Sequence, residues 1–309
     1  MGSPSAAPRL GRGHALRRRE TLAAYLFLLP ALAFFLLFVL APMGMGMVTS
    51  FFHYTMKTPV GADSFVGLGN YAALFRDPMF LRSLGNTTLL VAVAVPTVCL
   101  FSLWVASLLY ERRAGLRSFF RGVFYLPVVT GSVTVVVVWK WMFDYHRGLF
   151  NAVLTGTGLA SRNIDWLGNP HIALWCILLI LFTTSVGQPI VLYVAALGNV
   201  DQSQVEAAQV DGASRFQTFW RIQWPAILPT TLYVLVITTI NTFQCFALVQ
   251  LLTSGGPNGA TSTVMYYLYD TAFRVYRYGY ANAMGVVLAL LIAAVSFLQF
   301  RLLGKRVSY

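Results

Sequence analysis

One polar stretch between two long apolar segments organises this sequence: Glu206 to Pro229, reading EAAQVDGASRFQTFWRIQWPAILP. It carries charges of both signs and a spaced series of alanine, glycine, aromatic and proline residues. A loop that only connects two membrane helices needs solubility and sufficient length, and neither requires such a pattern. We therefore expect that a partner outside the membrane binds this loop.

The composition places the rest of the chain in a membrane. Of 309 residues, 57% are hydrophobic and 10% are charged, and the mean hydropathy is +0.67. Such a chain could not surround a soluble core with polar surface. The net charge of +12 is scattered around apolar segments instead of forming a basic face with stacking aromatics, which argues against nucleic-acid binding. The three cysteines lie in apolar runs, so we expect no disulfide or thiol metal site.

Six apolar stretches are close to or above the roughly 20 residues that a helix needs to cross the hydrocarbon core. The expected fold class is therefore all-α integral membrane, with six transmembrane helices. Residues 1–20, rich in Gly, Pro and Arg, are predicted to be a disordered tail, and residues 21–309 one membrane domain with 198–229 as its polar loop. The predicted spans are 22–48, 89–110, 123–143, 172–197, 230–252 and 281–302.

The distribution of Arg and Lys orients these helices. With six spans, both termini lie on the same side of the membrane as the 198–229 loop. That side holds 14 of the 22 basic residues and the other side holds 8. Because positively charged loops remain in the cytoplasm, we predict that both termini and the loop are cytoplasmic.

The loop is expected to form two short helices at an angle. Glu206–Ala208 favours a helix, and Asp211 is expected to cap the first turn of a second helix. Gly212 between them permits a sharp bend or a close backbone approach.

Three aromatic residues of the second helix, Phe216, Phe219 and Trp220, are spaced to share one face. Pro225 and Pro229 are then expected to end this element and to start the fifth span. Such an amphipathic helix suits either a groove on a partner or a layer of lipid headgroups. The spacing alone favours the headgroups.

Polar side chains are costly inside a membrane unless they have a partner or a function. The fourth and fifth spans each carry a face of them near the middle, where Gly187 and Pro189 are also expected to interrupt the fourth helix. Hydrogen bonding between helices and contact with a transported solute are about equally consistent with the spacing. The two faces consist of Thr184, Ser185 and Gln188, and of Thr238, Asn241 and Thr242.

An aromatic run follows the break at Ser254–Pro257, and it includes Tyr266, Tyr267, Tyr269 and Tyr280. A belt of aromatic side chains at the membrane interface explains this run better than stacking against a solute.

The polar loop resembles the EAA loop of the permease subunits of ABC importers, in the spacing of the carbohydrate branch. Trp224 stands where that family has leucine, a conservative change. Similar motifs occur at Phe65–Tyr71, Leu126–Trp141 and Leu252–Pro257, so the resemblance covers roughly residues 22–305. The matching loop residues are Glu206, Ala207, Ala208, Asp211, Gly212, Ala213, Phe219, Ile222, Pro225 and Pro229.

This resemblance implies the type I importer permease fold, in which the loop is a coupling helix that inserts into a cleft of a separate ATPase subunit. ATP and Mg would be bound by two such partner subunits and this chain would hold no cofactor, since Gly304-Lys305 lacks the upstream glycine of a phosphate loop. The resemblance also implies a second homologous permease, an external solute-binding lipoprotein and a multi-pass location in a bacterial inner membrane. The implied coupling residues are Glu206, Ala207, Ala208, Asp211, Gly212, Ala213, Phe216 and Phe219.

The two polar faces match positions that hold sugar in the similar maltose permeases. Neutral hydroxyl and amide groups suit an uncharged, polyhydroxylated solute. No arginine of the spans is expected to face them, which argues against an anionic solute. Within the maltose, trehalose and glycerol-phosphate branch the chain is most similar to the first permease of actinobacterial trehalose importers, which implies a disaccharide.

The alternative function is an ion-gradient-driven secondary transporter or channel. Such proteins usually carry carboxylates within the membrane or an inverted repeat, and neither is visible in the sequence. No set of residues suggests a catalytic centre, and the four histidines are too dispersed to hold a metal.

Overall fold

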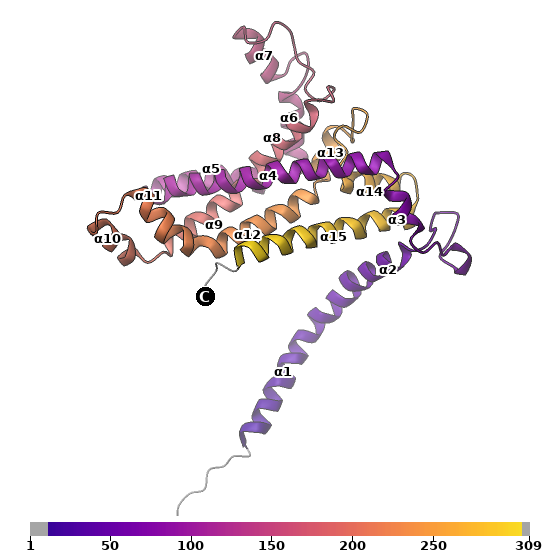
Figure 1. Ribbon diagram of the computed structural model, residues 1–309, viewed down its shortest axis with the longest axis horizontal. Helices are drawn as coiled ribbons and strands as arrows, with labels where there is room; N and C mark the ends of the chain where they lie inside the picture. The colour runs from indigo at the N-terminus through magenta and orange to yellow at the C-terminus, as the bar shows by residue number, and fades with distance from the viewer. Residues whose placement is uncertain (1–11, 305–309) are drawn as a thin grey trace, which may run out of the picture.

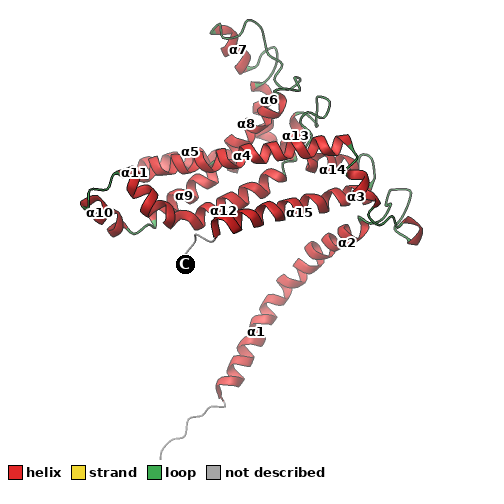
Figure 2. Ribbon diagram, in the orientation of Figure 1, coloured by secondary structure: helices red, strands yellow, loops and turns green. Residues whose placement is uncertain are grey.

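The computed structural model describes residues 12–304, and the regular elements in that range are all helices (Figures 1 and 2). Two π-helical turns, Leu36–Leu40 and Phe219–Gln223, and a 3₁₀ turn, Ala62–Ser64, accompany the α-helices. The α-helices are α1 Arg12–Phe35, α2 Ala41–Thr49, α3 Gly69–Leu74, α4 Pro78–Tyr110, α5 Ala114–Val129, α6 Ser132–Met142, α7 Leu149–Gly156, α8 Ala173–Ser185, α9 Gly187–Gly198, α10 Gln202–Val210, α11 Arg215–Thr218, α12 Trp224–Phe243, α13 Ala247–Leu252, α14 Val264–Phe273 and α15 Tyr278–Leu303.

All six predicted apolar stretches fall on helices that could cross a membrane. Five are single spans: Ala23–Thr49, Pro78–Tyr110, Ala173–Gly198, Arg215–Leu252 and Tyr278–Leu303. The sixth, predicted as one straight helix over 123–143, consists of α5 and α6, which meet at 95°. The straight helix is wrong because Thr130 and Gly131 have extended backbone, with ψ of 128° and 141°. The prediction of an all-α membrane fold is confirmed.

The fifth span also differs from expectation at its start. The helix runs from Arg215 through the π-helical turn and past Pro225 and Pro229 without a stop, so the prediction that these prolines end one element and start another is wrong. Pro225 lies in the first turn of α12, where a missing N–H costs little. The end of the loop and the fifth span therefore form one continuous helical rod from Arg215 to Phe243.

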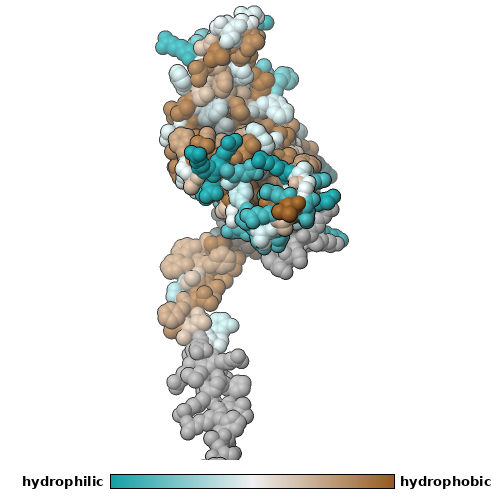
Figure 3. Space-filling view, turned by 90° about the vertical axis from the view of Figure 1, so that its left-hand side faces the viewer, coloured by the Kyte–Doolittle hydropathy of each residue, from teal (hydrophilic) through white to brown (hydrophobic). Residues whose placement is uncertain are grey.

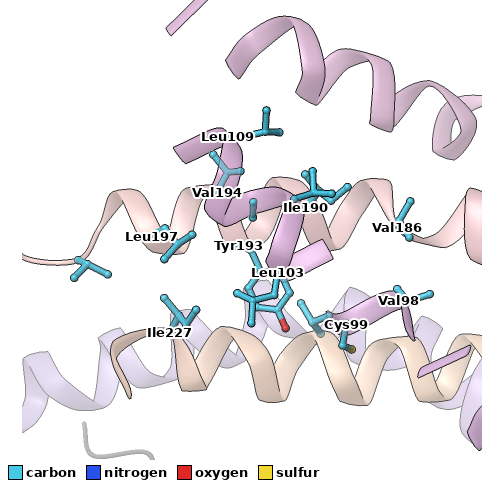
Figure 4. Packing of buried hydrophobic residues seen from close by; sticks show 14 of the residues in the cluster. Val98, Cys99, Leu103, Leu109, Val186, Ile190, Tyr193, Val194, Leu197 and Ile227 are labelled. Atoms are coloured by element: carbon cyan, nitrogen blue, oxygen red, sulfur yellow. The ribbon is translucent and has the colours of Figure 1, made fainter. Parts of the chain in front are cut away.

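The core of the bundle lies around α4. Its face carrying Val98, Cys99 and Leu103 packs against α9 and α12, with Tyr193 of α9 and Ile227 of α12 fully buried in the cluster (Figure 4). In a bilayer such contacts gain packing energy instead of hydrophobic energy, since lipid tails are as apolar as these side chains. The cluster makes α4, α9 and α12 the rigid frame of the subunit.

The first span stands apart from this frame (Figure 1). α1 begins at Arg12, inside the segment expected to be a disordered tail, whereas residues 1–11 lie outside the described range. Among the side chains that the structure describes, only those at the Thr49 end attach the span to the rest of the bundle. Asn282 donates to the hydroxyl of Thr49 at 2.7 Å, and Asn70 donates to the carbonyls of Ser50 and Phe52 at 2.8 and 2.9 Å.

At the same end, Asp77 caps α4 and links it to two further helices. Its Oδ2 accepts hydrogen bonds from the hydroxyls of Tyr267 on α14 and Tyr280 on α15, at 2.7 and 2.8 Å. Burial raises the pKa of Asp77, but these bonds and the N–H groups of Met79 and Phe80 outweigh it and hold the pKa below its usual value. Two tyrosines of the aromatic run are thus internal structural contacts, a role that neither the interfacial belt nor solute stacking describes.

Replacing Tyr267 with phenylalanine should lower the stability of the folded protein by about 1 kcal/mol, because it removes one hydrogen bond to a carboxylate. Because the pKa of Asp77 is lower in the folded protein than in the unfolded chain, its ionised carboxylate stabilises the fold at pH values above the unfolded pKa. The difference in stability between variant and wild type should therefore be full at pH 7 and should disappear as the pH falls below about 4 and through the folded pKa. Thermal unfolding in detergent between pH 7 and pH 3 measures this. Tyr269→Phe is the control, since Tyr269 offers only ring contacts with Phe246 and Phe273.

Candidate functional site

Three spans are interrupted in the same region of the bundle. α5 turns into α6 at Thr130, α8 passes into α9 at Val186, and α12 ends at Phe243 before α13 begins. Between them lies a cavity of about 390 Å³, here called the central cavity. Interrupted helices at mid-membrane are typical of solute sites, because they free backbone groups and make space.

Five of the six predicted contact residues line the central cavity: Thr184, Ser185, Gln188, Thr238 and Asn241. The hydroxyl of Thr184 bonds back to the carbonyls of Ile180 and Leu181. Within residues 12–304 the side chains of Ser185, Gln188 and Asn241 have no hydrogen-bond partner, and Gln188 and Asn241 are exposed. These groups are free to bind a solute.

Thr242 is the exception. It is buried, and its hydroxyl donates to the carbonyl of Thr238 one turn back at 2.8 Å. It was predicted to face the solute with Thr238 and Asn241 but does not line the central cavity, because Asn241 is turned about 60° from Thr238 in one direction around the helix and Thr242 about 40° in the other, into the bundle.

The α5–α6 corner adds two residues that the sequence interpretation missed, Thr130 and Ser132, which also line the central cavity. The short polar run Thr130-Gly131-Ser132 within an apolar stretch was the available signal. α6 begins beside the cavity with no side-chain cap, so the positive end of its dipole faces the same space.

The fourth span is interrupted by a single residue, and Val186 itself keeps helical backbone angles. Pro189 has no N–H to donate to the carbonyl of Ser185, so the regular helical hydrogen bond is missing at this point of the cavity wall. A β-carbon at Gly187 would lie 2.2 Å from the carbonyl oxygen of Phe124, so only glycine allows α9 to approach α5 this closely.

The polar loop is shaped by a Schellman motif at the end of α10. The N–H of Ala213 donates to the carbonyl of Ala208 at 2.9 Å, and the N–H of Gly212 to that of Gln209 at 3.1 Å. Gly212 has a φ of +81°, which glycine adopts without strain. The alanines and the glycine of the motif thus build a backbone corner, and Glu206, Ala207, Asp211 and Gly212 lie exposed on it.

Two details of the loop correct the sequence interpretation. Asp211 ends α10, and Ser214 caps α11 instead, in a capping box with Gln217. Phe216 is 72% exposed and Trp220 46%, whereas Phe219 packs against the core cluster around Tyr193. The three aromatics therefore do not present one common face.

The loop is tied to the end of α4. Gln202 of α10 donates to the hydroxyl of Tyr110, and Arg215 of α11 pairs with Glu111 at 3.1 Å. Asp201 begins α10, and hydrogen bonds from the hydroxyl and the N–H of Ser203 hold the pKa of Asp201 below its usual value. Hydrophilic residues gather at the end of the bundle formed by this loop (Figure 3).

Among the described residues no group of three or more His, Cys, Asp or Glu could hold a metal ion.

The geometry offers an apolar frame, a polar cavity at the helix breaks and an exposed loop whose last part is continuous with one cavity-lining helix. That arrangement is typical of a membrane transport component.

Comparison with known proteins identifies the class. Residues 65–309 match the family described as binding-protein-dependent transport system inner membrane component. The chain is 35% identical to the diacetylchitobiose uptake system permease protein NgcF of Streptomyces coelicolor, over 97% of this chain and 89% of that one. It is 33% identical to the multiple sugar-binding transport system permease protein MsmF of Streptococcus mutans, over 90% and 94%.

Crystal structures of a bacterial ABC transporter that imports the acidic polysaccharide alginate have the same fold. The TM-score is 0.78 at 25% identity, over 95% of this chain and 99% of the matched chain. The chain therefore belongs to the family of binding-protein-dependent inner-membrane transport components, and it has the fold of an ABC importer permease.

Proposed function

We propose that this chain is one of two permease subunits of an ATP-driven sugar importer, and that the central cavity is its part of the solute pathway. A disaccharide such as trehalose or maltose is the proposed solute. Relatives named for diacetylchitobiose and for multiple sugars support the sugar class. Neutral hydroxyl and amide groups around a cavity of disaccharide size support the same class.

The observation that carries the proposal is the convergence of Ser185, Gln188 and Asn241, from two different spans, on one cavity with their polar groups unpaired within residues 12–304. A role limited to bonding between helices would have paired these groups with one another.

The partners follow from the loop. Glu206, Ala207, Ala208, Asp211, Gly212, Ala213 and Phe216 would contact a separate ATPase subunit, which binds ATP and Mg, while Phe219 holds the loop to the core. Closure of two such ATPases would push the Arg215–Phe243 rod, whose far half carries Thr238 and Asn241. A second permease and an external binding protein complete the proposed complex, with both termini cytoplasmic.

Asn241→Ala and Gln188→Ala should each reduce uptake about tenfold without loss of assembly, because each removes a polar contact with the solute. Uptake of radiolabelled trehalose, maltose and lactose into proteoliposomes holding the whole complex measures this. Gln244→Ala is the matched control, since Gln244 is an exposed amide of the same span outside the cavity.

Loss of assembly in both variants would favour a structural role for the two amides. The alternative of an ion-gradient-driven transporter or channel makes a separate prediction. Uptake would then persist with an ATPase subunit unable to hydrolyse ATP and would collapse with an ionophore.

A further inference from the structure

A second hollow adjoins the central cavity on the side of the polar loop. It lies between α5 and α9, has a volume of about 440 Å³ and is here called the inner groove. Its walls are Arg121, Gly122 and Tyr125 of α5 and Gln188, Val191 and Leu192 of α9. Gln188 and Leu192 line both hollows, so the inner groove continues the central cavity.

A third hollow extends the cavity in the opposite direction. It shares Pro127, Thr130 and Thr184 with the central cavity and reaches Trp139 on α6. The three hollows follow one another along the broken third and fourth spans. The inner groove lies at the end of this track nearer the loop, because Arg121 and Tyr125 belong to the half of the span that begins at Ala114.

Arg121 is the feature that distinguishes the inner groove. It is half-buried and has no ion pair or hydrogen bond within residues 12–304, whereas Arg215 pairs with Glu111. A guanidinium placed partly out of water without a carboxylate is costly unless something else binds it. It presents donors in a planar fork that matches two neighbouring oxygen atoms.

Tyr125 lies one helical turn beyond Arg121 and is 39% exposed. Gly122 between them has open space where a β-carbon would stand. The groove therefore offers a flat aromatic face, a forked donor and the Gln188 amide around a gap without side chains. A sugar ring is bound by the same kinds of group: an aromatic face to stack on and hydrogen-bond donors for its oxygens.

We propose that Arg121 and Tyr125 form a saccharide subsite on the cytoplasmic side of the central cavity, where the solute is held before release. This proposal rests on the proposed function. The sugar ring stacks on Tyr125, and the Arg121 guanidinium donates to two neighbouring oxygen atoms carried by the ring. Those oxygens belong either to neighbouring hydroxyls of a neutral sugar or to the carboxylate of an acidic one. On this proposal Arg121 would face the pathway beside Gln188, which is contrary to the expectation that no arginine does so.

Arg121→Gln in the assembled complex should lower uptake of radiolabelled trehalose or maltose about tenfold, the effect of losing one hydrogen bond to a charged group. Arg121→Lys should lower it nearly as much, since lysine keeps the charge and loses the fork. Arg117→Gln, one turn back on the same helix and outside the groove, should leave uptake unchanged. Binding-protein-stimulated ATP hydrolysis should persist in all three, so that more ATP is spent per sugar.

Calorimetry distinguishes whether Arg121 binds hydroxyl or carboxylate oxygens. A neutral disaccharide and its uronic-acid analogue are each added to the detergent-solubilised complex, and their binding is measured. Weakened binding of both to Arg121→Gln indicates hydroxyl recognition, and weakened binding of the uronate alone indicates carboxylate recognition. If Arg121→Gln fails to assemble, Arg121→Lys decides the result.

Two results would overturn the subsite. Equal uptake by Arg121→Gln and Arg117→Gln would place the groove off the pathway. An uptake defect that occurs in vesicles with phosphatidylglycerol and disappears in pure phosphatidylcholine would assign Arg121 to lipid headgroups. Asn241→Ala in the same assay distinguishes the failures: if it lowers uptake when Arg121→Gln does not, the central cavity stands and only the subsite fails.

Discussion

Replacing Gly212 with valine should reduce uptake at least tenfold while the membrane part of the subunit keeps its stability. The φ of +81° at this position costs a β-branched residue about 1–2 kcal/mol or more, so the Schellman corner opens and Ala208 and Ala213 lose their hydrogen bond. The exposed residues of the loop then no longer keep the arrangement that an ATPase cleft would recognise. Uptake and ATP hydrolysis, measured separately in the reconstituted complex, test this.

Gly212→Asn is the matched control, because asparagine tolerates positive φ better than any other residue with a side chain. It should retain most of the uptake. Glu206→Ala is a complementary variant, since the Glu206 side chain is exposed and makes no hydrogen bond or ion pair within residues 12–304. It should leave thermal unfolding unchanged and still lower solute-stimulated ATP hydrolysis. If both Gly212→Val and Glu206→Ala preserve uptake and hydrolysis, the loop does not couple to an ATPase.

Replacing Gly187 with valine should have the largest effect on the fold. The new β-carbon would lie 2.2 Å from the Phe124 carbonyl oxygen and 2.9 Å from a methyl group of Val128, both on α5. A backbone atom cannot move aside, so α5 and α9 must separate at the central cavity. We expect a loss of at least about 3 kcal/mol, above the usual cost of overpacking, and little assembled complex.

Gly198→Ala provides the comparison on the same helix, because a β-carbon at Gly198 meets no atom within 4 Å. It should be neutral in expression, in complex yield measured by size-exclusion chromatography and in thermal unfolding. A Gly187→Val protein that assembles and unfolds like Gly198→Ala would show that the close α5–α9 contact does not hold the third span in place.

Hydropathy located the six spans because the cost of burying polar groups in lipid depends on composition alone. It could not locate the 95° bend at Thr130, since both halves of that stretch are apolar and only three polar residues separate them. The continuity past Pro225 and Pro229 was also hidden. Proline rules describe helices in water, and a π-helical turn just before Pro225 let this helix continue.

For the candidate site, residue type predicted more than local geometry did. Polar residues inside apolar spans led correctly to Ser185, Gln188 and Asn241 at one cavity. The cap of α11 was assigned to Asp211 instead of Ser214, because both residue types are good caps and only the backbone decides which one lies at the helix start. The hydrogen bonds from Tyr267 and Tyr280 to Asp77 could not be predicted, since the two tyrosines lie 190 and 203 residues away along the chain.

The three helix breaks around the central cavity also determine how the protein is hydrated at rest. The backbone groups at these helix ends cannot remain unpaired at the depth of the hydrocarbon core. Water must therefore occupy the cavity whenever no solute does. A water-filled cavity midway through the membrane shortens the apolar barrier that ions must cross. The resistance of the membrane to ion leak at this protein therefore depends on the side-chain packing that closes the cavity at its two ends.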